Sequence, residues 1–183
     1  MVWNKAIFLT GMMGSGKSTV GAFLAESLSV CFIDLDTRIE RIQGRSIAEL
    51  FARSDTHFRS VETQALQSLA FDPGFSRRLS VVATGGGVVL DPENIEWMEQ
   101  VGCSVYLQLP LEVLERRLGQ DQERESRPLL AAAGRLSTVL ATMALTRGHL
   151  YESCTHTVSA EGTPKSVAER IQQCVNAEKK IDR

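Results

Sequence analysis

Five short, largely apolar runs alternate along the chain with longer segments whose apolar residues recur every three or four positions. Apolar runs bounded by turn residues are typical of buried strands, and the longer periodicity is typical of amphipathic helices. The predicted strands cover residues 6–9, 30–34, 79–83, 104–109 and 156–158. Because strands and helices alternate throughout, we expect an α/β fold with a five-stranded parallel sheet flanked by helices.

Capping residues indicate where several of the helices begin. Ser46 and Glu49 match a capping box, and Asp55 is expected to cap the helix that follows it. Pro92 and Pro164 each suit the first position of a helix. The predicted helices cover residues 20–28, 37–43, 46–51, 55–69, 92–99, 112–118, 136–151 and 164–175.

The sequence GMMGSGKST at residues 11–19 joins the first predicted strand to the first predicted helix. It fits the phosphate-loop pattern GxxxxGK(S/T), whose glycines let backbone N–H groups surround phosphate oxygens at the positive end of a helix. Lys17 is then expected to reach the β- and γ-phosphates of a nucleotide, and Ser18 to offer a hydroxyl to Mg²⁺. A glycine-rich turn that fits the pattern by chance is the alternative. The candidate nucleotide-binding residues are Gly14, Ser15, Gly16, Lys17, Ser18 and Thr19.

Two further groups of residues follow predicted strands. Asp34 and Asp36 come at the end of the second strand, and they would lie on one side if the extended conformation continued. Gly85, Gly86 and Gly87 follow the third strand, where missing side chains permit a close approach to the backbone, although a flexible turn needs the same residues. Because ligands bind at the carboxyl ends of parallel strands, we expect these groups and the phosphate loop to face one crevice.

A charged pair lies on the apolar face of the helix predicted over residues 55–69. Glu62 falls within the apolar stripe that includes Phe58 and Val61, and Arg59 lies at its edge. Residues three positions apart on a helix are close enough to pair, so Glu62 is expected to hold the Arg59 guanidinium in a fixed orientation. A solvated surface pair is the alternative.

Residues 119–135 form a polar segment of weak periodicity that is rich in arginine. Such a segment within a nucleotide-binding fold is typical of a mobile lid that closes over phosphates, and an ordinary solvated loop is the alternative. The arginines in or beside it are Arg116, Arg117, Arg124, Arg127, Arg135 and Arg147. Fifteen of the twenty basic residues in the chain are arginine, a bias that suits anionic ligands and equally fits codon usage.

The length of 183 residues indicates one domain over residues 1–183. A net charge of −2 and a pI of about 6.0 do not favour a nucleic-acid partner. The four cysteines lack CxxC spacing, which favours a reduced protein of the cytoplasm without a zinc site. No signal-peptide pattern and no apolar run of about 20 residues is present, so we expect a soluble protein without a membrane partner, as a monomer.

Together these groups supply what phosphoryl transfer requires. The loop with Lys17 provides a phosphate cradle, and Ser18 with Asp34 provides a site for Mg²⁺. Asp36 is expected to orient or deprotonate an acceptor hydroxyl, and Arg59 suits an anionic small molecule. No NKxD-like guanine-binding sequence is present. The residues themselves predict a small-molecule kinase with an acidic or phosphorylated acceptor, and they leave that acceptor unnamed.

The chain also resembles the shikimate kinases over nearly its whole length. Six motifs occur in the order and approximate spacing of that family: GMMGSGKST at 11–19, DLD at 34–36, FRSVE at 58–62, GGG at 85–87, RPL at 127–129 and RGHLY at 147–151. Each motif alone has limited specificity, whereas the ordered set is specific. The resemblance implies a sheet of the nucleoside-monophosphate-kinase type, with an acceptor-binding region at about 34–62 and a lid at about 118–136.

The resemblance implies ATP-dependent phosphorylation of the 3-hydroxyl of shikimate, a step toward chorismate and the aromatic amino acids. By position, Asp36 would bind the shikimate hydroxyls and be the candidate base, and Asp34 would bind Mg²⁺ through water. Arg59 and Arg147 would bind the shikimate carboxylate, with Glu62 orienting Arg59. The substrate-binding residues that it implies are Asp36, Arg59, Gly85, Gly86, Gly87 and Arg147.

The same resemblance assigns residues around the transferred phosphate. Arg127 would be the lid arginine that reaches this phosphate, so that the candidate catalytic residues are Lys17, Asp36 and Arg127. Arg117 would lie against adenine. Two features depart from the family: the stretch between Arg117 and Arg127 is slightly long compared with some members, and His149 stands where proline is frequent.

Two other functions fit part of the pattern. Another small-acid kinase, such as gluconate kinase, would share the phosphate loop, but it is not expected to combine Asp36, Arg59 and the three glycines. A nucleotide-binding switch would bind ATP without transferring phosphate. Such a module should have lost Lys17, Asp36 or Arg127, and all three are present.

Overall fold

The computed structural model describes residues 6–72, 75, 79–120 and 135–181, and for residues 178–181 it describes the backbone alone. Arg124, Arg127 and most of the predicted lid lie outside these residues. Within the described ranges, no helix combines the length and the apolar character needed to cross a membrane. All four cysteines are described, and each is a free thiol.

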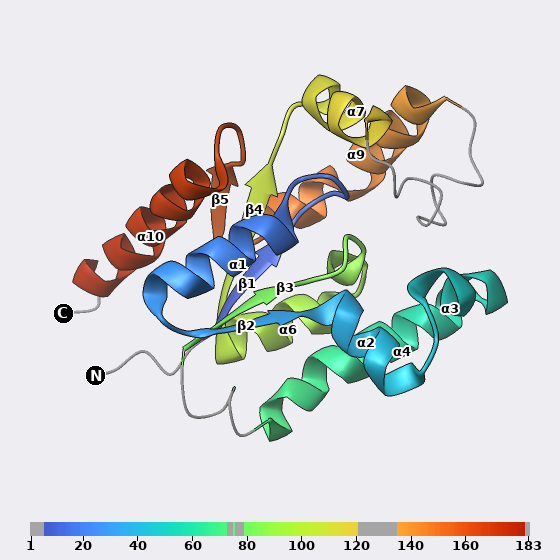
Figure 1. Ribbon diagram of the computed structural model, residues 1–183, viewed down its shortest axis with the longest axis horizontal. Helices are drawn as coiled ribbons and strands as arrows, with labels where there is room; N and C mark the ends of the chain where they lie inside the picture. The colour runs from blue at the N-terminus through green and yellow to red at the C-terminus, as the bar shows by residue number, and fades with distance from the viewer. Residues whose placement is uncertain (1–5, 73–74, 76–78, 121–134, 182–183) are drawn as a thin grey trace.

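One parallel sheet forms the centre of the molecule (Figure 1). Its five strands stand in the order β2-β3-β1-β4-β5. They are β1 (Ala6–Thr10), β2 (Cys31–Asp34), β3 (Ser80–Ala83), β4 (Gly102–Gln108) and β5 (His156–Ser159). The central strand β1 is fully buried, with no exposed surface on Phe8 or Leu9. The predicted fold class is confirmed, and every predicted strand overlaps an observed one.

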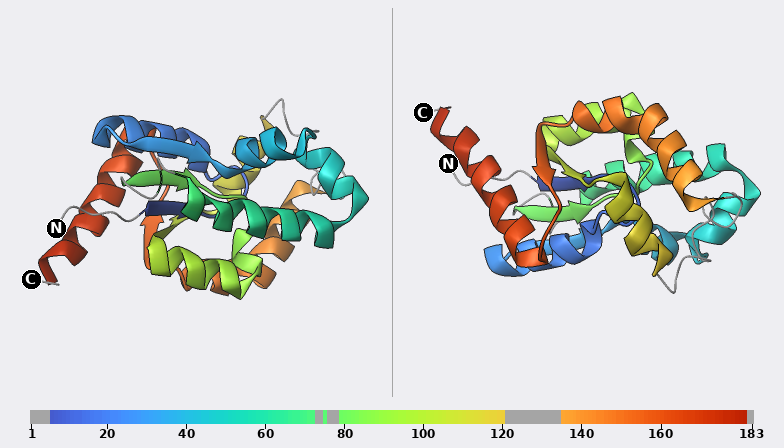
Figure 2. Two further views of the ribbon diagram at one scale, coloured as in Figure 1. Left: turned by 90° about the horizontal axis from the view of Figure 1, so that it is seen from below. Right: turned by 90° about the horizontal axis from the view of Figure 1, so that it is seen from above.

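Helices cover both faces of the sheet (Figure 2). Helices α1 (Lys17–Leu28) and α10 (Pro164–Ile181) lie on one face, and α6 (Pro92–Val101) and α9 (Leu136–Glu152) lie on the other. The remaining elements are α2 (Leu35–Gln43), α3 (Ile47–Arg53), α4 (Asp55–Gln67), α7 (Leu111–Gly119) and the 3₁₀ turns η1 (Ser68–Phe71) and η2 (Val88–Leu90). Figure 1 places α2, α3 and α4 on the β2 side of the sheet and α7 on the β4 side, so that they flank the loops after β1 and β3.

The start of α3 was predicted correctly, whereas the start of α4 was not. Ser46 and Glu49 form the capping box of α3, each side chain bonding to the backbone of the other. In α4, the Ser54 hydroxyl accepts from the His57 amide, and Asp55 is the first residue within the helix. Asp55 is not the cap because Ser54, with extended backbone, already provides the side-chain oxygen one residue earlier.

The two carboxylates after β2 are also arranged differently from the prediction. Strand β2 ends at Asp34, and Asp36 lies in the first turn of α2. Extended backbone does not continue, because the Asp34 side chain accepts the Thr37 amide at 3.0 Å and so caps α2. The start of a helix, and not the two-residue period of a strand, therefore brings Asp36 toward the carboxyl end of the sheet.

Candidate functional site

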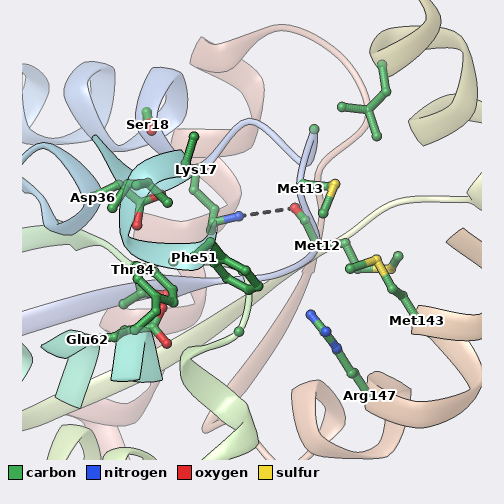
Figure 3. A pocket seen from close by; sticks show the side chains of 18 of the residues that line it. Met12, Met13, Lys17, Ser18, Asp36, Phe51, Glu62, Thr84, Met143 and Arg147 are labelled. Carbon is green, nitrogen blue, oxygen red and sulfur yellow. Dashed lines mark hydrogen bonds between the residues drawn. The ribbon is translucent and has the colours of Figure 1, made fainter. Parts of the chain in front are cut away.

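A cavity of about 750 Å³ lies at the carboxyl ends of β1 and β3 (Figure 3). Most of the predicted site residues line it: Gly14, Gly16, Lys17, Ser18, Thr19, Asp36, Arg59, Gly85, Gly86, Gly87, Arg117 and Arg147. Ser15 is buried beneath this lining, and Asp34 contacts the lining residue Ser18. Arg127 lies outside the described residues. The structure thus brings the phosphate loop, the Asp36 carboxylate and the three glycines into one crevice.

The phosphate loop adopts a backbone that its glycines permit. Gly11, Gly14 and Gly16 have φ angles of 137°, 78° and 95°, a region that residues with a Cβ rarely adopt. Gly16 is the N-cap of α1, so the positive end of this helix lies at the cavity. The Lys17 ammonium donates to the carbonyl oxygens of Gly11, at 2.8 Å, and Met12, at 3.1 Å (Figure 3). It therefore lies across the loop at the cavity edge.

Ser18 and Asp34 bring two oxygen ligands together beside the loop. The Ser18 hydroxyl donates to Asp34 Oδ2 at 2.6 Å. Mg²⁺ takes oxygen ligands, and in nucleotide sites it keeps water and phosphate oxygens as most of its coordination. Within the described part of the chain, no group of three or more His, Cys, Asp or Glu residues could hold a metal ion. The hydroxyl and carboxylate present here fit a Mg²⁺ ion that arrives with a nucleotide.

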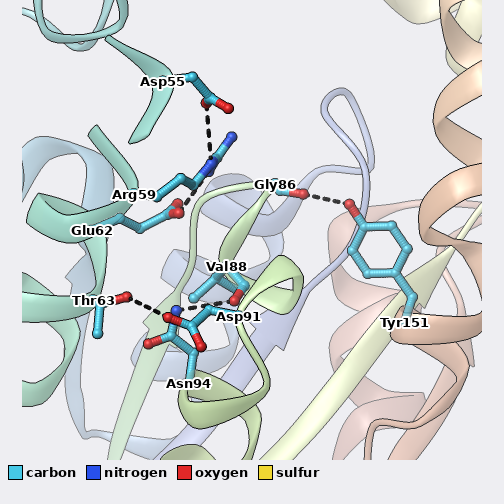
Figure 4. Close-up of polar contacts among 9 residues, drawn as sticks. All are labelled: Asp55, Arg59, Glu62, Thr63, Gly86, Val88, Asp91, Asn94 and Tyr151. Carbon is cyan, nitrogen blue, oxygen red and sulfur yellow. Dashed lines mark hydrogen bonds and ion pairs between the residues drawn. The ribbon is translucent and has the colours of Figure 1, made fainter. Parts of the chain in front are cut away.

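The Arg59 guanidinium is held from several sides (Figure 4). Its Nη1 donates to Glu62 Oε2 at 2.6 Å, and its Nε lies 3.4 Å from Asp55 Oδ1. The guanidinium carbon lies 5.3 Å and 5.0 Å from the ring centroids of Phe51 and Phe58. Because the Glu62 side chain is 1% exposed, the pair with Arg59 is not a solvated surface pair. A buried carboxylate and two aromatic rings restrict the guanidinium to one orientation.

Gly85 and Gly87 leave room for this ion pair. A Cβ at Gly87 would overlap the Arg59 guanidinium, and a Cβ at Gly85 would overlap Glu62 Oε1. Gly86 differs, because a Cβ there would meet only ordinary contacts of 3.5 Å or more. The close approach to the backbone predicted from three successive glycines is therefore present at Gly85 and Gly87. There the Glu62 and Arg59 side chains approach the backbone.

The Asp36 carboxylate lies beside Lys17 in the cavity (Figure 3). Loss of hydration in the site raises the pKa of Asp36 above its usual range, and the Lys17 ammonium opposes this rise. The nearby carboxylates of Asp34 and Glu40 add to the rise. A carboxylate with a raised pKa binds a proton more strongly, which suits the removal of a proton from a hydroxyl group.

Two further arginines, on α7 and α9, line the cavity. Arg117, on α7, places Nη1 at 3.4 Å from the carbonyl oxygens of Gly14 and Ser15, and Nη2 at 3.4 Å from that of Ala160. It therefore connects the phosphate loop to the segment after β5. Arg147, on α9, directs its guanidinium into the cavity, across from Asp36 (Figure 3).

Two aromatic residues of the site were missed by sequence reasoning. Phe51 contacts Arg59 from a separate helix, and no local pattern connects α3 to α4. Tyr151 donates its hydroxyl hydrogen to the Gly86 carbonyl oxygen (Figure 4). A signal for Tyr151 was available, because it stands four residues after Arg147 and so shares its face of the helix.

Comparisons with known proteins identify the family of this chain. A family model described as shikimate kinase matches residues 13–176. The shikimate kinase of Gloeobacter violaceus is 39% identical over 178 residues, which cover 97% of this chain and 96% of that protein. The shikimate kinase of Synechococcus elongatus is 46% identical over 136 residues, covering 74% and 67%. The structure of shikimate kinase from Acinetobacter baumannii in complex with shikimate has a TM-score of 0.85 at 35% identity, covering 96% and 94%. This chain belongs to the shikimate kinase family.

Proposed function

We infer that this protein is an enzyme that phosphorylates the 3-hydroxyl of shikimate with ATP, giving 3-phosphoshikimate and ADP on the pathway to chorismate and the aromatic amino acids. One observation carries this inference: a single cavity contains both a phosphate loop and an arginine fixed by a buried glutamate. The loop suits ATP, and the arginine suits the carboxylate of a small acid. Family membership and the relative solved with shikimate support shikimate as that acid.

On the nucleotide side, the backbone amides of residues 14–19 would surround the ATP phosphates. Lys17, now bonded to two carbonyl oxygens of the loop, stands where its ammonium can turn to the β- and γ-phosphates. Arg117 lies between the loop and Ala160, and it would pack against adenine there. Arg127 would contact the transferring phosphate, an assignment that rests on the family resemblance.

Ser18 and Asp34 would hold the Mg²⁺ that accompanies ATP, with Asp34 acting through water. Bound Mg²⁺ would offset the negative charge of the phosphates. The hydrogen bond between these two side chains supports the assignment, because it keeps a hydroxyl and a carboxylate oxygen together beside the loop.

On the acceptor side, Arg59 and Arg147 would bind the shikimate carboxylate, and Gly86 would contact the ring, with Gly85 and Gly87 beside it in the cavity lining. Asp36 would bind the hydroxyls. As the 3-oxygen forms its bond to the γ-phosphorus and the bond to ADP breaks, the hydroxyl proton would pass to Asp36. The raised pKa of Asp36 favours it as the proton acceptor.

We also propose that residues 1–183 act as one domain, as a monomer in the cytoplasm, without a nucleic-acid or membrane partner. The single sheet, with helices covering both of its faces, supports a single domain. The net charge of −2 supports the lack of a nucleic-acid partner. Sedimentation equilibrium of the purified protein tests the monomer, and a concentration-dependent increase in mass would contradict it.

The proposed function is tested by ADP release from Mg-ATP with shikimate, gluconate or AMP as acceptor. Release stimulated by shikimate alone is the expected result, with 3-phosphoshikimate as the second product. Stimulation by gluconate or AMP alone would show that the protein is a kinase whose acceptor is not shikimate. ATP binding without release in all three assays would favour a nucleotide-binding switch. Omission of Mg²⁺, with EDTA present, is expected to abolish release.

A further inference from the structure

Tyr151 is a buried polar residue that the reaction described above does not use. It lies in the last turns of α9 and has 1% of its surface exposed. Its ring stacks on that of Tyr106 with centroids 5.0 Å apart and planes inclined by 12°. Its hydroxyl donates to the carbonyl oxygen of Gly86, within the glycine segment that lines the cavity (Figure 4).

The peptide unit that accepts this bond has little intrinsic preference for one orientation. It joins Gly86 to Gly87, and neither residue has a Cβ to restrict its backbone angles. The described peptides contain no cis bond, so the Gly87 N–H points opposite to the Gly86 carbonyl. With the carbonyl bonded to Tyr151, the Gly87 N–H therefore points away from Tyr151, to the side on which Arg59 lies (Figure 4).

The orientation of this peptide matters because an anionic acceptor is expected beside it. An N–H directed toward the Arg59 side adds a positive dipole end next to the acid. A peptide turned by half a rotation would instead direct the carbonyl oxygen there, where it would repel a carboxylate. The Tyr151 hydroxyl, a donor on the opposite side of the peptide, favours the orientation in which the Gly86 carbonyl faces Tyr151.

We propose that Tyr151 is a positioning residue for the acceptor: its hydroxyl holds the Gly86–Gly87 peptide with the N–H toward the acceptor side of the cavity. The inference rests on the proposed function, since it takes shikimate as the acceptor. Tyr151 and the cavity-lining Arg147 are one turn apart on α9. One rigid helix thus carries both a charged contact for the acid and the bond that sets the glycine segment.

The bond is available throughout the pH range in which such an enzyme is assayed. Burial raises the pKa of Tyr151 to about 12, and the nearby Arg147 and Arg59 guanidiniums only partly oppose this rise, so the hydroxyl keeps its proton and remains a donor. The Gly86 carbonyl does not titrate. The effect of removing the hydroxyl should therefore be the same at pH 7 and pH 9.

The variant Tyr151→Phe tests the proposal, because it removes the hydroxyl and keeps the ring that stacks on Tyr106. We expect the KM for shikimate to rise about 3- to 10-fold, the loss typical of one hydrogen bond, with kcat and the KM for ATP nearly unchanged. Equilibrium titration with shikimate alone should show the same increase in Kd. Tyr106→Phe is the matched control, since it removes a hydroxyl from the same aromatic stack but not the bond to Gly86.

The possible outcomes separate this proposal from the proposed function. A wild-type enzyme that does not phosphorylate shikimate would overturn the function and, with it, the inference. If the wild type is active and Tyr151→Phe has the same shikimate KM and Kd as Tyr106→Phe, the positioning role is wrong and the function stands. A lower melting temperature with unchanged shikimate binding would identify the bond as structural and would also overturn the role.

Discussion

Arg59 is the residue whose chemistry is most restricted by its neighbours. Its guanidinium donates to Glu62 and lies over the Phe51 and Phe58 rings, contacts that need a planar group with several donors. In Arg59→Lys we expect the KM for shikimate to rise about 10- to 100-fold, because a charge-assisted hydrogen bond is worth ~1.5–3 kcal/mol. The KM for ATP should change little. Steady-state kinetics with each substrate varied in turn measures both.

Arg53→Lys is the control for that variant. Arg53 is exposed in the last turn of α3 and does not line the cavity. The same change of side chain should leave both KM values as in the wild type. A shikimate KM in Arg59→Lys that matches the Arg53→Lys value would remove Arg59 from the acceptor site.

The Asp36 carboxylate is expected to increase activity and to lower the stability of the folded protein. We expect Asp36→Asn to fold and to lower kcat by at least about 100-fold, the usual contribution of a general base or acid. At neutral pH the variant should also melt at a higher temperature than the wild type. The pKa of Asp36 is raised by loss of hydration, so ionisation is more costly in the folded state than in the unfolded state.

The pH dependence of that stability difference follows from the direction of the pKa shift. Below the unfolded pKa of Asp36, near 3.8, both states bind the proton and the wild type has no penalty. As the pH rises from there through the higher folded pKa, the unfolded state loses its proton first and the wild type loses stability. Melting temperatures of both proteins from pH 4 to pH 8 should therefore diverge.

The kcat of Asp36→Asn tests its role in the reaction separately from stability. A wild-type kcat in this variant would exclude Asp36 as base or anchor.

At the scale of elements, α3 acts as a support for the acceptor site. Its capping box at Ser46 fixes where it begins, and Phe51 near its end contacts Arg59. Ser46→Ala should lower the free energy of unfolding by ~1 kcal/mol, and local loosening of α3 should raise the shikimate KM about two- to threefold. Chemical denaturation and kinetics measure these two effects.

Thr163→Ala provides a comparison that also removes a capping hydroxyl, together with one methyl group. The Thr163 hydroxyl accepts from the Ser166 amide at the start of α10, which covers the sheet away from the cavity (Figure 1). We expect a similar stability loss with an unchanged shikimate KM. If Ser46→Ala and Thr163→Ala change the KM equally, α3 has no special role in the acceptor site and only global stability is involved.

Sequence periodicity predicted the elements better than their junctions. Apolar runs identified the five strands of the sheet. For β1, β3 and β4 the reason is burial on both faces of a parallel sheet, which requires continuous apolar residues, whereas the edge strands β2 and β5 are partly exposed. Errors arose where two local rules competed within one or two residues. Asp34 ends β2 and also caps α2, so Asp36 lies in a helix and not in extended backbone. Ser54 replaces Asp55 as the cap of α4. Each error concerns a side chain that can bond to nearby backbone, which a periodic pattern does not register.

At the scale of the whole molecule, the site combines contacts that differ in how far sequence alone can predict them. The pair of Arg59 with Glu62 lies within one helix, so helical spacing was sufficient to predict it. The crevice itself followed from the carboxyl ends of parallel strands. The bond from Tyr151 to Gly86 joins α9 to the loop after β3, and no local rule connects them. Packing across the sheet decides such contacts.

The same connections predict how the molecule responds to its acceptor. Elements on both sides of the sheet line one cavity, so we expect a single unfolding transition that shikimate shifts as a whole. At 100 times its Kd, shikimate should stabilise the protein by about 2.7 kcal/mol, which corresponds to an increase in melting temperature of about 5 to 11 °C. Scanning calorimetry with and without shikimate measures this shift.

Arg59→Lys makes that calorimetric measurement specific to the site. At the same shikimate concentration, an affinity weaker by 10-fold or more should reduce the stabilisation to about 1.4 kcal/mol or less, since it depends on the logarithm of ligand concentration over Kd. The shift produced by ATP should stay as in the wild type, because Arg59 belongs to the acceptor side of the cavity. Two separate transitions, of which shikimate moved only one, would contradict the single domain. An undiminished shikimate shift in the variant would place the acid elsewhere.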